Sequence, residues 1–193
     1  GSIPETIGNL SSLTNLDLQR NQLTGSIPET IGNLSSLDYL VLRNNLLTGS
    51  IPETIGNLNN LSYLDLQRNQ LTGRIPDAIG NLSSLYWLHL NDNQLTGRIP
   101  GTIGNLSRLY LLHLNDNQLR GIVPSNLCNI PNLSVIELAN NNLCPSYPTC
   151  ITSIGTQDIS KCHFPDIYDL SPDEPVSGQM VTLTGINFGS PFD

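Results

Sequence analysis

The sequence is poor in positive charge. Only one of its 193 residues is a lysine, Lys161, and seven are arginines, so that the formal net charge is −8. Nucleic acids and anionic membranes are bound mainly by clustered lysine and arginine side chains. The sequence therefore argues against either partner.

Long apolar runs and catalytic motifs are missing as well. No run approaches the roughly 20 apolar residues that a membrane-spanning helix needs, so we expect no direct membrane insertion by this segment. The chain begins at Gly1 without a signal sequence, which indicates a removed targeting peptide or an excerpt of a longer protein. No G-x-S-x-G, HExxH or phosphate-binding glycine loop occurs. An enzyme is therefore the least favoured class, and we expect no cofactor.

Cysteine is absent from the first two thirds of the chain. The four cysteines are Cys128, Cys144, Cys150 and Cys162. An even, clustered set without C-x-x-C spacing favours two disulfides over a zinc site, and disulfides favour an extracellular or cell-surface location.

What the sequence has in abundance is an internal repeat. Glycine recurs at positions 1, 25, 49, 73, 97 and 121 with the intervening residues in register, which gives a period of 24. No single unit can bury its many apolar residues alone, whereas stacked units form a continuous core. The sequence therefore predicts a solenoid. An asparagine column should satisfy buried turn backbone, and it consists of Asn21, Asn45, Asn69, Asn93, Asn117 and Asn141.

Each unit contains one strand pattern. Leu16-Asp17-Leu18 and its equivalents alternate inward and outward, so successive strands should stack in parallel. Six full units are followed by a partial seventh, which we expect to cap the solenoid. The register fails beyond Ile154, because Gln157 falls where leucine is required.

The unit LSSLTNLDLQRNQLTGSIPETIGN resembles the plant-type leucine-rich repeat, LxxLxxLxLxxNxLxGxIPxxIGx, over residues 1–154. The resemblance implies an α/β-type solenoid, a right-handed superhelix with a parallel sheet on its concave side and a mostly irregular or 3-10 convex side. Family members are extracellular receptor domains and secreted inhibitors that bind proteins, peptides, hormones or glycans, and their repeats carry no catalytic residues.

The rest of the chain loses the period. Residues 155–174, with Cys162, are predicted to form an acidic linker or an extension of the cap. Residues 175–193 contain VTLTGINFG, which resembles the opening strands of the immunoglobulin-like IPT/TIG domain. We therefore expect a β-rich, truncated domain there.

Two outward columns of the expected concave sheet gather aromatic residues. Aromatic side chains are enriched at interface hot spots and at sugar-stacking sites, although they can also merely stiffen a sheet by cross-strand packing. We expect this patch to bind the ligand. Its members are Tyr39, Tyr63, Tyr86, Trp87 and Tyr110.

A polar group is expected beside this patch. His89 and His113 should lie one strand apart, with Asp92 and Asp116 close by. Such a group could bind a divalent metal or respond to pH. Because LHLNDNQL occurs twice intact, duplication explains the pairing more simply, and we predict ligand binding here without a metal.

Six Asn-x-Ser sequons, at Asn9, Asn33, Asn60, Asn81, Asn105 and Asn132, predict surface glycosylation, unless they merely reflect the repeat consensus. Stacking of the sixth and seventh units should bring Cys128 to Cys150 and leave Cys144 for Cys162, although two other connectivities are possible.

We therefore expect an extracellular, non-catalytic module that binds protein, peptide or glycan through the concave aromatic face. The alternative is a subunit of an extracellular fibre or surface coat, in which copies of the chain associate head to tail through uncapped ends. A third possibility is ice binding, because the file of Thr24, Thr48, Thr72 and Thr96 resembles the ladders of ice-binding solenoids.

Overall fold

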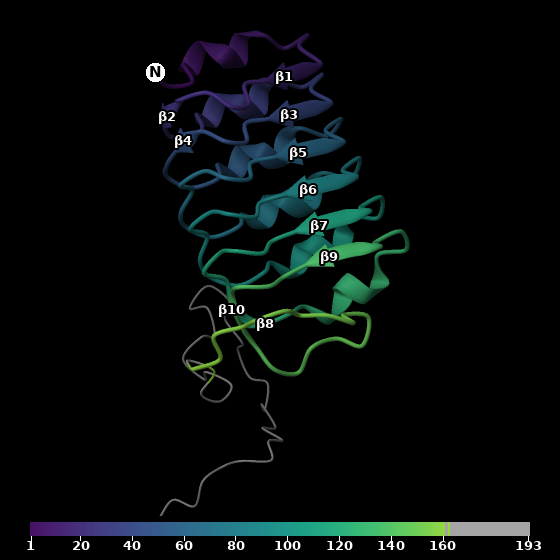
Figure 1. The fold of residues 1–193 in the computed structure, drawn as a ribbon. Helices are drawn as coiled ribbons and strands as arrows, with labels where there is room; N and C mark the ends of the chain where they lie inside the picture. Colours follow the sequence, from purple (N-terminus) through teal and green to yellow (C-terminus); the bar gives the residue numbers. More distant parts are fainter. Residues whose placement is uncertain (161, 163–193) are drawn as a thin grey trace, which may run out of the picture. The chain divides into compact units, whose positions relative to one another are not determined.

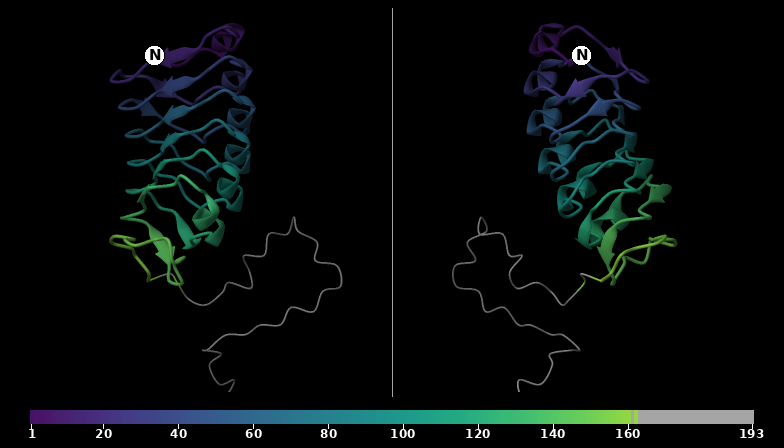
Figure 2. Two further views of the ribbon diagram at one scale, coloured as in Figure 1. Left: turned by 90° about the vertical axis from the view of Figure 1, so that its right-hand side faces the viewer. Right: turned by 60° about the vertical axis from the view of Figure 1, so that its left-hand side comes forward.

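The chain was analysed as a computed structural model, which describes residues 1–160 and 162. In this part the backbone forms successive turns that stack along one axis, with strands on one side and 3-10 helices on the other (Figures 1 and 2). The strands pair in parallel, in chain order, into a six-stranded sheet. These strands are β1 (Asn15–Asp17), β3 (Tyr39–Val41), β5 (Tyr63–Asp65), β6 (Trp87–His89), β7 (Leu111–His113) and β9 (Val135–Glu137).

The register of this sheet follows directly from the period. Tyr39 pairs with Tyr63 and Leu40 with Leu64, in each case 24 residues apart. The central residue of each strand, leucine in all but β9, points inward, and Leu40, Leu64 and Leu88 are completely buried. Burying one leucine contributes about 1.5–3 kcal/mol, and a slip of one residue would turn the leucines outward. The buried column therefore fixes which side chains the outer surface of the sheet, the strand face, presents.

The opposite side consists of one 3-10 turn per repeat. Proline precedes each turn and fixes the backbone for entry, and the turn ends where the N–H of Leu34 or its equivalent bonds back to the isoleucine carbonyl. Thr30 donates from its hydroxyl to the Glu5 carbonyl of the previous turn at 2.7 Å, which links neighbouring turns. The 3-10 helices are η1 (Glu5–Asn9), η2 (Glu29–Asn33), η3 (Glu53–Asn57), η4 (Asp77–Asn81), η5 (Gly101–Asn105) and η6 (Ser125–Asn129).

The asparagine column joins each repeat to the preceding one. The Asn69 Nδ2 donates to the carbonyls of Leu42 and Leu66 at 3.0 and 3.1 Å, and its Oδ1 accepts from the Leu47 N–H at 3.1 Å. Asn69 is only 9% exposed. Its Oδ1 is therefore the acceptor of the Leu47 N–H, while its Nδ2 shares the Leu42 and Leu66 carbonyls with the amides of Asn45 and Asn93.

A second set of parallel main-chain bonds runs beside the sheet. The N–H groups of Thr48 and Thr72 donate to the carbonyls of Gly25 and Gly49 at 2.9 and 2.8 Å. We call the surface along these bonds the lateral face; it carries the predicted threonine file. Its regular strands are β2 (Thr24–Gly25) with β4 (Leu46–Leu47), and β8 (Arg120–Ile122) with β10 (Asn142–Cys144).

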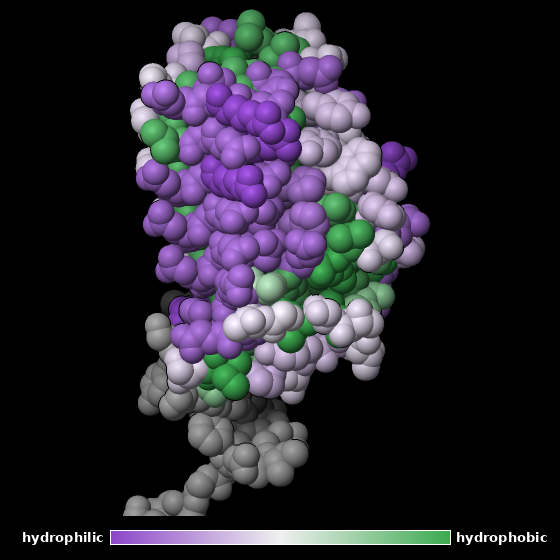
Figure 3. Space-filling model, viewed as in Figure 1, coloured by the Kyte–Doolittle hydropathy of each residue, from purple (hydrophilic) through white to green (hydrophobic). Residues whose placement is uncertain are grey.

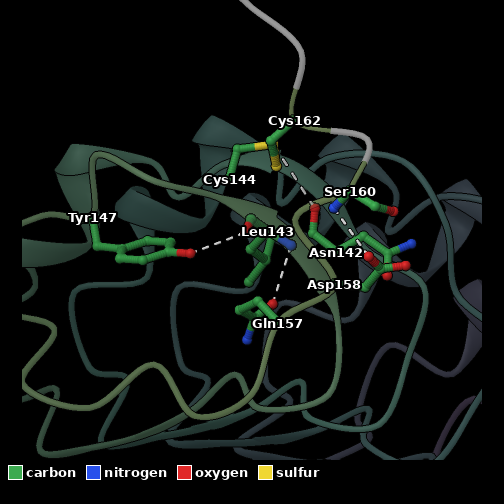
Figure 4. The surroundings of a disulfide bond; sticks show 8 residues. All are labelled: Asn142, Leu143, Cys144, Tyr147, Gln157, Asp158, Ser160 and Cys162. Carbon is green, nitrogen blue, oxygen red and sulfur yellow. Dashed lines mark hydrogen bonds between the residues drawn. A yellow bond between two sulfur atoms is a disulfide. The ribbon is translucent and has the colours of Figure 1, made fainter.

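The last turn is shorter than the repeats before it, and a glutamine takes the place of the ladder asparagine. Gln157 accepts from the Leu143 N–H at 3.1 Å (Figure 4). It also donates to the carbonyls of Leu138 and Ile154 at 2.8 and 2.9 Å. Asn141 does the same work one turn earlier. The Asp158 N–H also donates to the Asn141 carbonyl at 2.8 Å, so hydrogen bonding with the stack continues beyond the expected end at Ile154.

Two disulfides hold this end. Cys128 is joined to Cys150 and Cys144 to Cys162, with Cα–Cα distances of 5.5 and 5.4 Å. These are the two pairs expected from the stacking of the columns. The Tyr147 hydroxyl donates to the Leu143 carbonyl at 3.0 Å beside the second disulfide (Figure 4).

The predicted parallel solenoid with little regular helix is confirmed. Gly1–Cys162 forms one compact unit. The predicted IPT/TIG-like strands at 175–193 and most of the acidic segment 155–174 lie outside the described residues. Among the residues that the structure describes, no helix is long and apolar enough to cross a membrane.

Candidate ligand-binding face

The structure brings the predicted aromatic patch together on the strand face. Tyr39, Tyr63 and Trp87 occupy one column of paired strand residues, and Tyr86 and Tyr110 lie beside it. Tyr39 is 40% exposed and Tyr110 36%, whereas the other three are half-buried. Near-neutral and hydrophobic side chains over the strands adjoin a continuous hydrophilic band in Figure 3.

The rings of the patch pack against one another. The planes of Tyr86 and Tyr110 differ by 5° with centroids 5.2 Å apart, and Tyr39 and Tyr63 stack at 5.8 Å. Parallel rings at such a distance face each other, because rings side by side in one plane would overlap. Trp87 meets Tyr86 edge to face at 4.4 Å. The stacked tyrosines therefore cover one another's faces and present mainly their edges.

The two predicted histidines are in contact. The Nδ1 atoms of His89 and His113 lie 3.2 Å apart, so that one ring donates and the other accepts. The Nε2 of His113 lies 3.8 Å from a Glu137 carboxylate oxygen. Burial is the largest influence on His89 and lowers its pKa; His113 and Arg43 lower it too, while Asp65 and Glu137 act in the opposite direction. His89 is therefore neutral at physiological pH.

A buried carboxylate next to His89 was not among the predicted site residues. Asp65 points outward from β5, yet it is completely buried. The Gln67 N–H and side-chain amide donate to it at 3.2 Å, and an Arg43 nitrogen lies 3.8 Å away. Burial and the neighbouring Asp65 carboxylate raise the pKa of Tyr63. The sequence does place Asp65 in the same outward column as His89, His113 and Glu137. The burial of Asp65 under Gln67 and Arg43 depends on side-chain packing, which the repeat pattern does not predict.

Asp92 and Asp116 take part in turns as well as facing outward. Both have positive φ, 55° in each case, a conformation that aspartate and asparagine tolerate better than most residues. Asp92 accepts from the Asn91 amide at 2.7 Å and lies 3.7 Å from Arg68. Asp116 accepts from the amides of Asn115 and Asn140. Within residues 1–160 and 162, no three His, Cys, Asp or Glu side chains are close enough to hold a metal ion.

The predicted sequons lie away from the strand face. Four of their asparagines end 3-10 helices, and Asn60 and Asn132 lie in the turns that follow. All six are exposed. The Asn60 amide donates to the Ser35 carbonyl at 2.8 Å, whereas glycosylation would require this nitrogen.

Comparison with known proteins identifies the repeat. The leucine-rich repeat family model matches residues 11–71, 38–95 and 83–143. No curated protein matches the chain.

Solved structures of plant receptors are similar to the chain. The ectodomain of the Arabidopsis thaliana receptor kinase GASSHO1/SCHENGEN3, in complex with CASPARIAN STRIP INTEGRITY FACTOR 2, is 40% identical with a TM-score of 0.75. That match covers 78% of this chain and 18% of the receptor chain. The Arabidopsis HAESA ectodomain, in complex with an extended IDA peptide hormone, is 35% identical with a TM-score of 0.75, and the match covers 80% and 26%.

A plant ice-binding protein is also similar, with 37% identity, a TM-score of 0.66 and coverage of 75% of this chain and 46% of that one. The chain thus spans less than half the length of each of these relatives. Matched family models over residues 11–143, together with the stacked parallel strands, show that the chain belongs to the leucine-rich repeat family.

Proposed function

We propose that the chain is a non-catalytic, extracellular recognition module of the plant type that binds a peptide or protein segment along the strand face. The observation that carries the proposal is the aromatic patch of five Tyr and Trp side chains, which pack against one another on a sheet whose buried leucines already form the core. Tyrosine and tryptophan give large contact areas at low entropic cost and dominate binding hot spots.

Relatives support the same assignment. The HAESA structure contains a peptide hormone ligand, and two disulfides in the described chain fit an oxidising, extracellular location. The six exposed sequons lie on the helix side or the turns beside it, so that glycans there would leave the strand face free. Head-to-tail assembly into a fibre or coat, and glycan binding, stay predictions from the sequence.

Selection from a random peptide library on the whole chain tests the proposal. Peptides selected on the wild-type protein are expected to bind at least tenfold more weakly to Trp87→Ala, because this ring contacts Tyr63 and Tyr86 at the centre of the patch. Gln70→Ala, an exposed change on the lateral face, is the matched control.

Circular dichroism and the melting temperature of each variant separate lost binding from lost folding. Selected peptides that bind Trp87→Ala and wild type equally, but lose binding to Gln70→Ala, would place the ligand on the lateral face instead.

The lateral face carries a second candidate function, ice binding. Thr24, Thr48 and Thr72 are exposed there, and main-chain bonds at 2.8–2.9 Å hold the last two in register. A similar solved structure is that of a plant ice-binding protein. Thermal hysteresis that is lost in Thr72→Tyr would support this candidate, and its absence from the wild-type protein would eliminate it.

A further inference from the structure

The strand face is electrically asymmetric along the solenoid. In the first three repeats each outward segment contains one carboxylate and one arginine: Asp17 and Arg20, Asp38 and Arg43, Asp65 and Arg68. The next three segments, residues 86–95, 110–119 and 134–142, contain carboxylates and neither lysine nor arginine. The carboxylates of this acidic half are Asp92, which lies 3.7 Å from Arg68 of the preceding repeat, Asp116 and Glu137.

The acidic half also contains buried polar atoms without hydrogen-bond partners. In the part of the chain that the structure describes there are four such side-chain atoms, and three belong to this half: Asn91 Oδ1, Asn115 Oδ1 and His113 Nε2. Asn91 is only 7% exposed. An unpartnered buried polar group costs about 1–3 kcal/mol, and a bound ion or water is one of the things that satisfy such groups in native proteins.

The geometry of the two amides fixes what they offer. The Nδ2 of Asn91 donates to Asp92 at 2.7 Å, and that of Asn115 donates to Asp116 at 2.6 Å. Each side chain therefore has its donor engaged and its oxygen left as a free acceptor. Because the main-chain N–H of Asp92 bonds to the Asn115 carbonyl at 3.1 Å, the two Asn–Asp pairs are neighbours.

The two free amide oxygens and the neighbouring carboxylates match a group that donates several hydrogen bonds, accepts none and carries positive charge. Guanidinium and ammonium groups are the protein groups of that kind. Trp87 and Tyr110 lie on the same repeats, and aromatic rings attract cations. His89 supplies no opposing charge, since burial keeps it neutral although Asp65 and Glu137 lie on either side of it.

We propose that Asn91, Asn115, Asp92, Asp116, Glu137 and His113 form a subsite for an arginine or lysine side chain of the ligand. The inference rests on the proposed function and specifies its ligand: a peptide with a basic residue that binds over β6, β7 and β9. Because both amide oxygens are buried, the cationic group reaches them only if the side chains that cover them shift. A formal net charge of −8 accelerates the approach of such a ligand.

The test uses arginine amide as the probe and the whole chain, by NMR titration at low ionic strength. Shifts are expected in the side-chain amides of Asn91 and Asn115 and in the ring of His113. N-acetylglutamate, as an anionic probe, should leave these signals unchanged. Shifts that are spread over the whole chain, or equal for both probes, would overturn the proposal.

Variants that neutralise charge sharpen the test. The triple variant Asp92→Asn, Asp116→Asn, Glu137→Gln should weaken binding of arginine amide at least fivefold. The control variant, Asp17→Asn with Asp38→Asn, removes carboxylates from the arginine-containing half. It should change the affinity for arginine amide less than twofold. Should the triple variant fail to fold, Asn115→Ala keeps the charge and is expected to weaken binding of arginine amide at least threefold. Unchanged affinity in the folded variants would reject the subsite.

The two proposals fail in different ways. Selected peptides that need Trp87 but contain no enriched arginine or lysine would leave the recognition module standing and reject the subsite. Binding of arginine amide at these residues without any selected peptide would support the cation subsite and reject the peptide-recognition module.

Discussion

Each asparagine of the column except the first hydrogen-bonds main-chain groups of two repeats, so one substitution should measurably destabilise the stack. Replacing Asn69 by alanine leaves the Leu47 N–H without its acceptor, while the carbonyls of Leu42 and Leu66 keep the amides of Asn45 and Asn93. We expect a loss of about 1–3 kcal/mol in the free energy of unfolding, the cost of one buried unsatisfied group. Urea denaturation measures it. Asn21→Ala is the control, because Asn21 is exposed, and an equal loss there would contradict the explanation.

His89 should make stability depend on pH. Burial lowers its pKa below the ordinary value of about 6.5, so the unfolded chain binds a proton more readily than the folded one. The free energy of unfolding therefore decreases as pH falls below about 6.5, and this loss ends below the folded pKa. In His89→Gln the decrease between pH 7.5 and 5.5 should be smaller than in wild type. Parallel curves for the two proteins would show that other groups cause it.

Residues also show where sequence reasoning stops. The columns predicted the burial of Leu64 and the proximity of His89 and His113, because a strict period places equivalent residues one strand apart. They did not predict that Asp65 is covered, or that the aromatic rings face one another, since side-chain packing decides both.

Among the elements, the 3-10 helices depend on close contact between turns. A Cβ added to Gly56 in η3 would lie 2.5 Å from the Ala78 carbonyl oxygen and 2.7 Å from its Cβ. Gly56→Ala should therefore destabilise the protein by about 1–3 kcal/mol through overpacking. Gly101 in η5 has nothing within 4 Å of such a Cβ, so Gly101→Ala should be neutral or stabilise by up to about 1 kcal/mol. Thermal unfolding of the two variants compares them directly, and equal effects would contradict the packing account.

The last turn shows the same limit of prediction at the level of elements. The column count placed the end of the register at Ile154, because position 157 lacks leucine. Gln157 instead serves the ladder through its longer amide side chain, as Asn141 does one turn earlier. A shortened turn brings that position into place, and the period of the full repeats contains no information about it.

For the whole molecule, contacts only between neighbouring repeats imply that unfolding starts at an end. Replacing Cys144 and Cys162 by serine removes the disulfide that holds the end of the last turn against β10. Hydrogen exchange should accelerate at Leu143 and around Gln157 while the amides of Leu64 and Leu88 keep their protection. Faster exchange throughout the stack would instead indicate that the repeats unfold as a single unit.

The hydrogen bonds between turns join positions about 22–27 residues apart, so a whole 24-residue unit can be gained or lost without breaking the pattern. Each such event would change the separation between the arginine-bearing and acidic ends of the strand face by one strand spacing, about 4.8 Å. The distance between the two ends therefore changes in steps of one repeat, and duplication of one unit changes the length of ligand that can reach both ends.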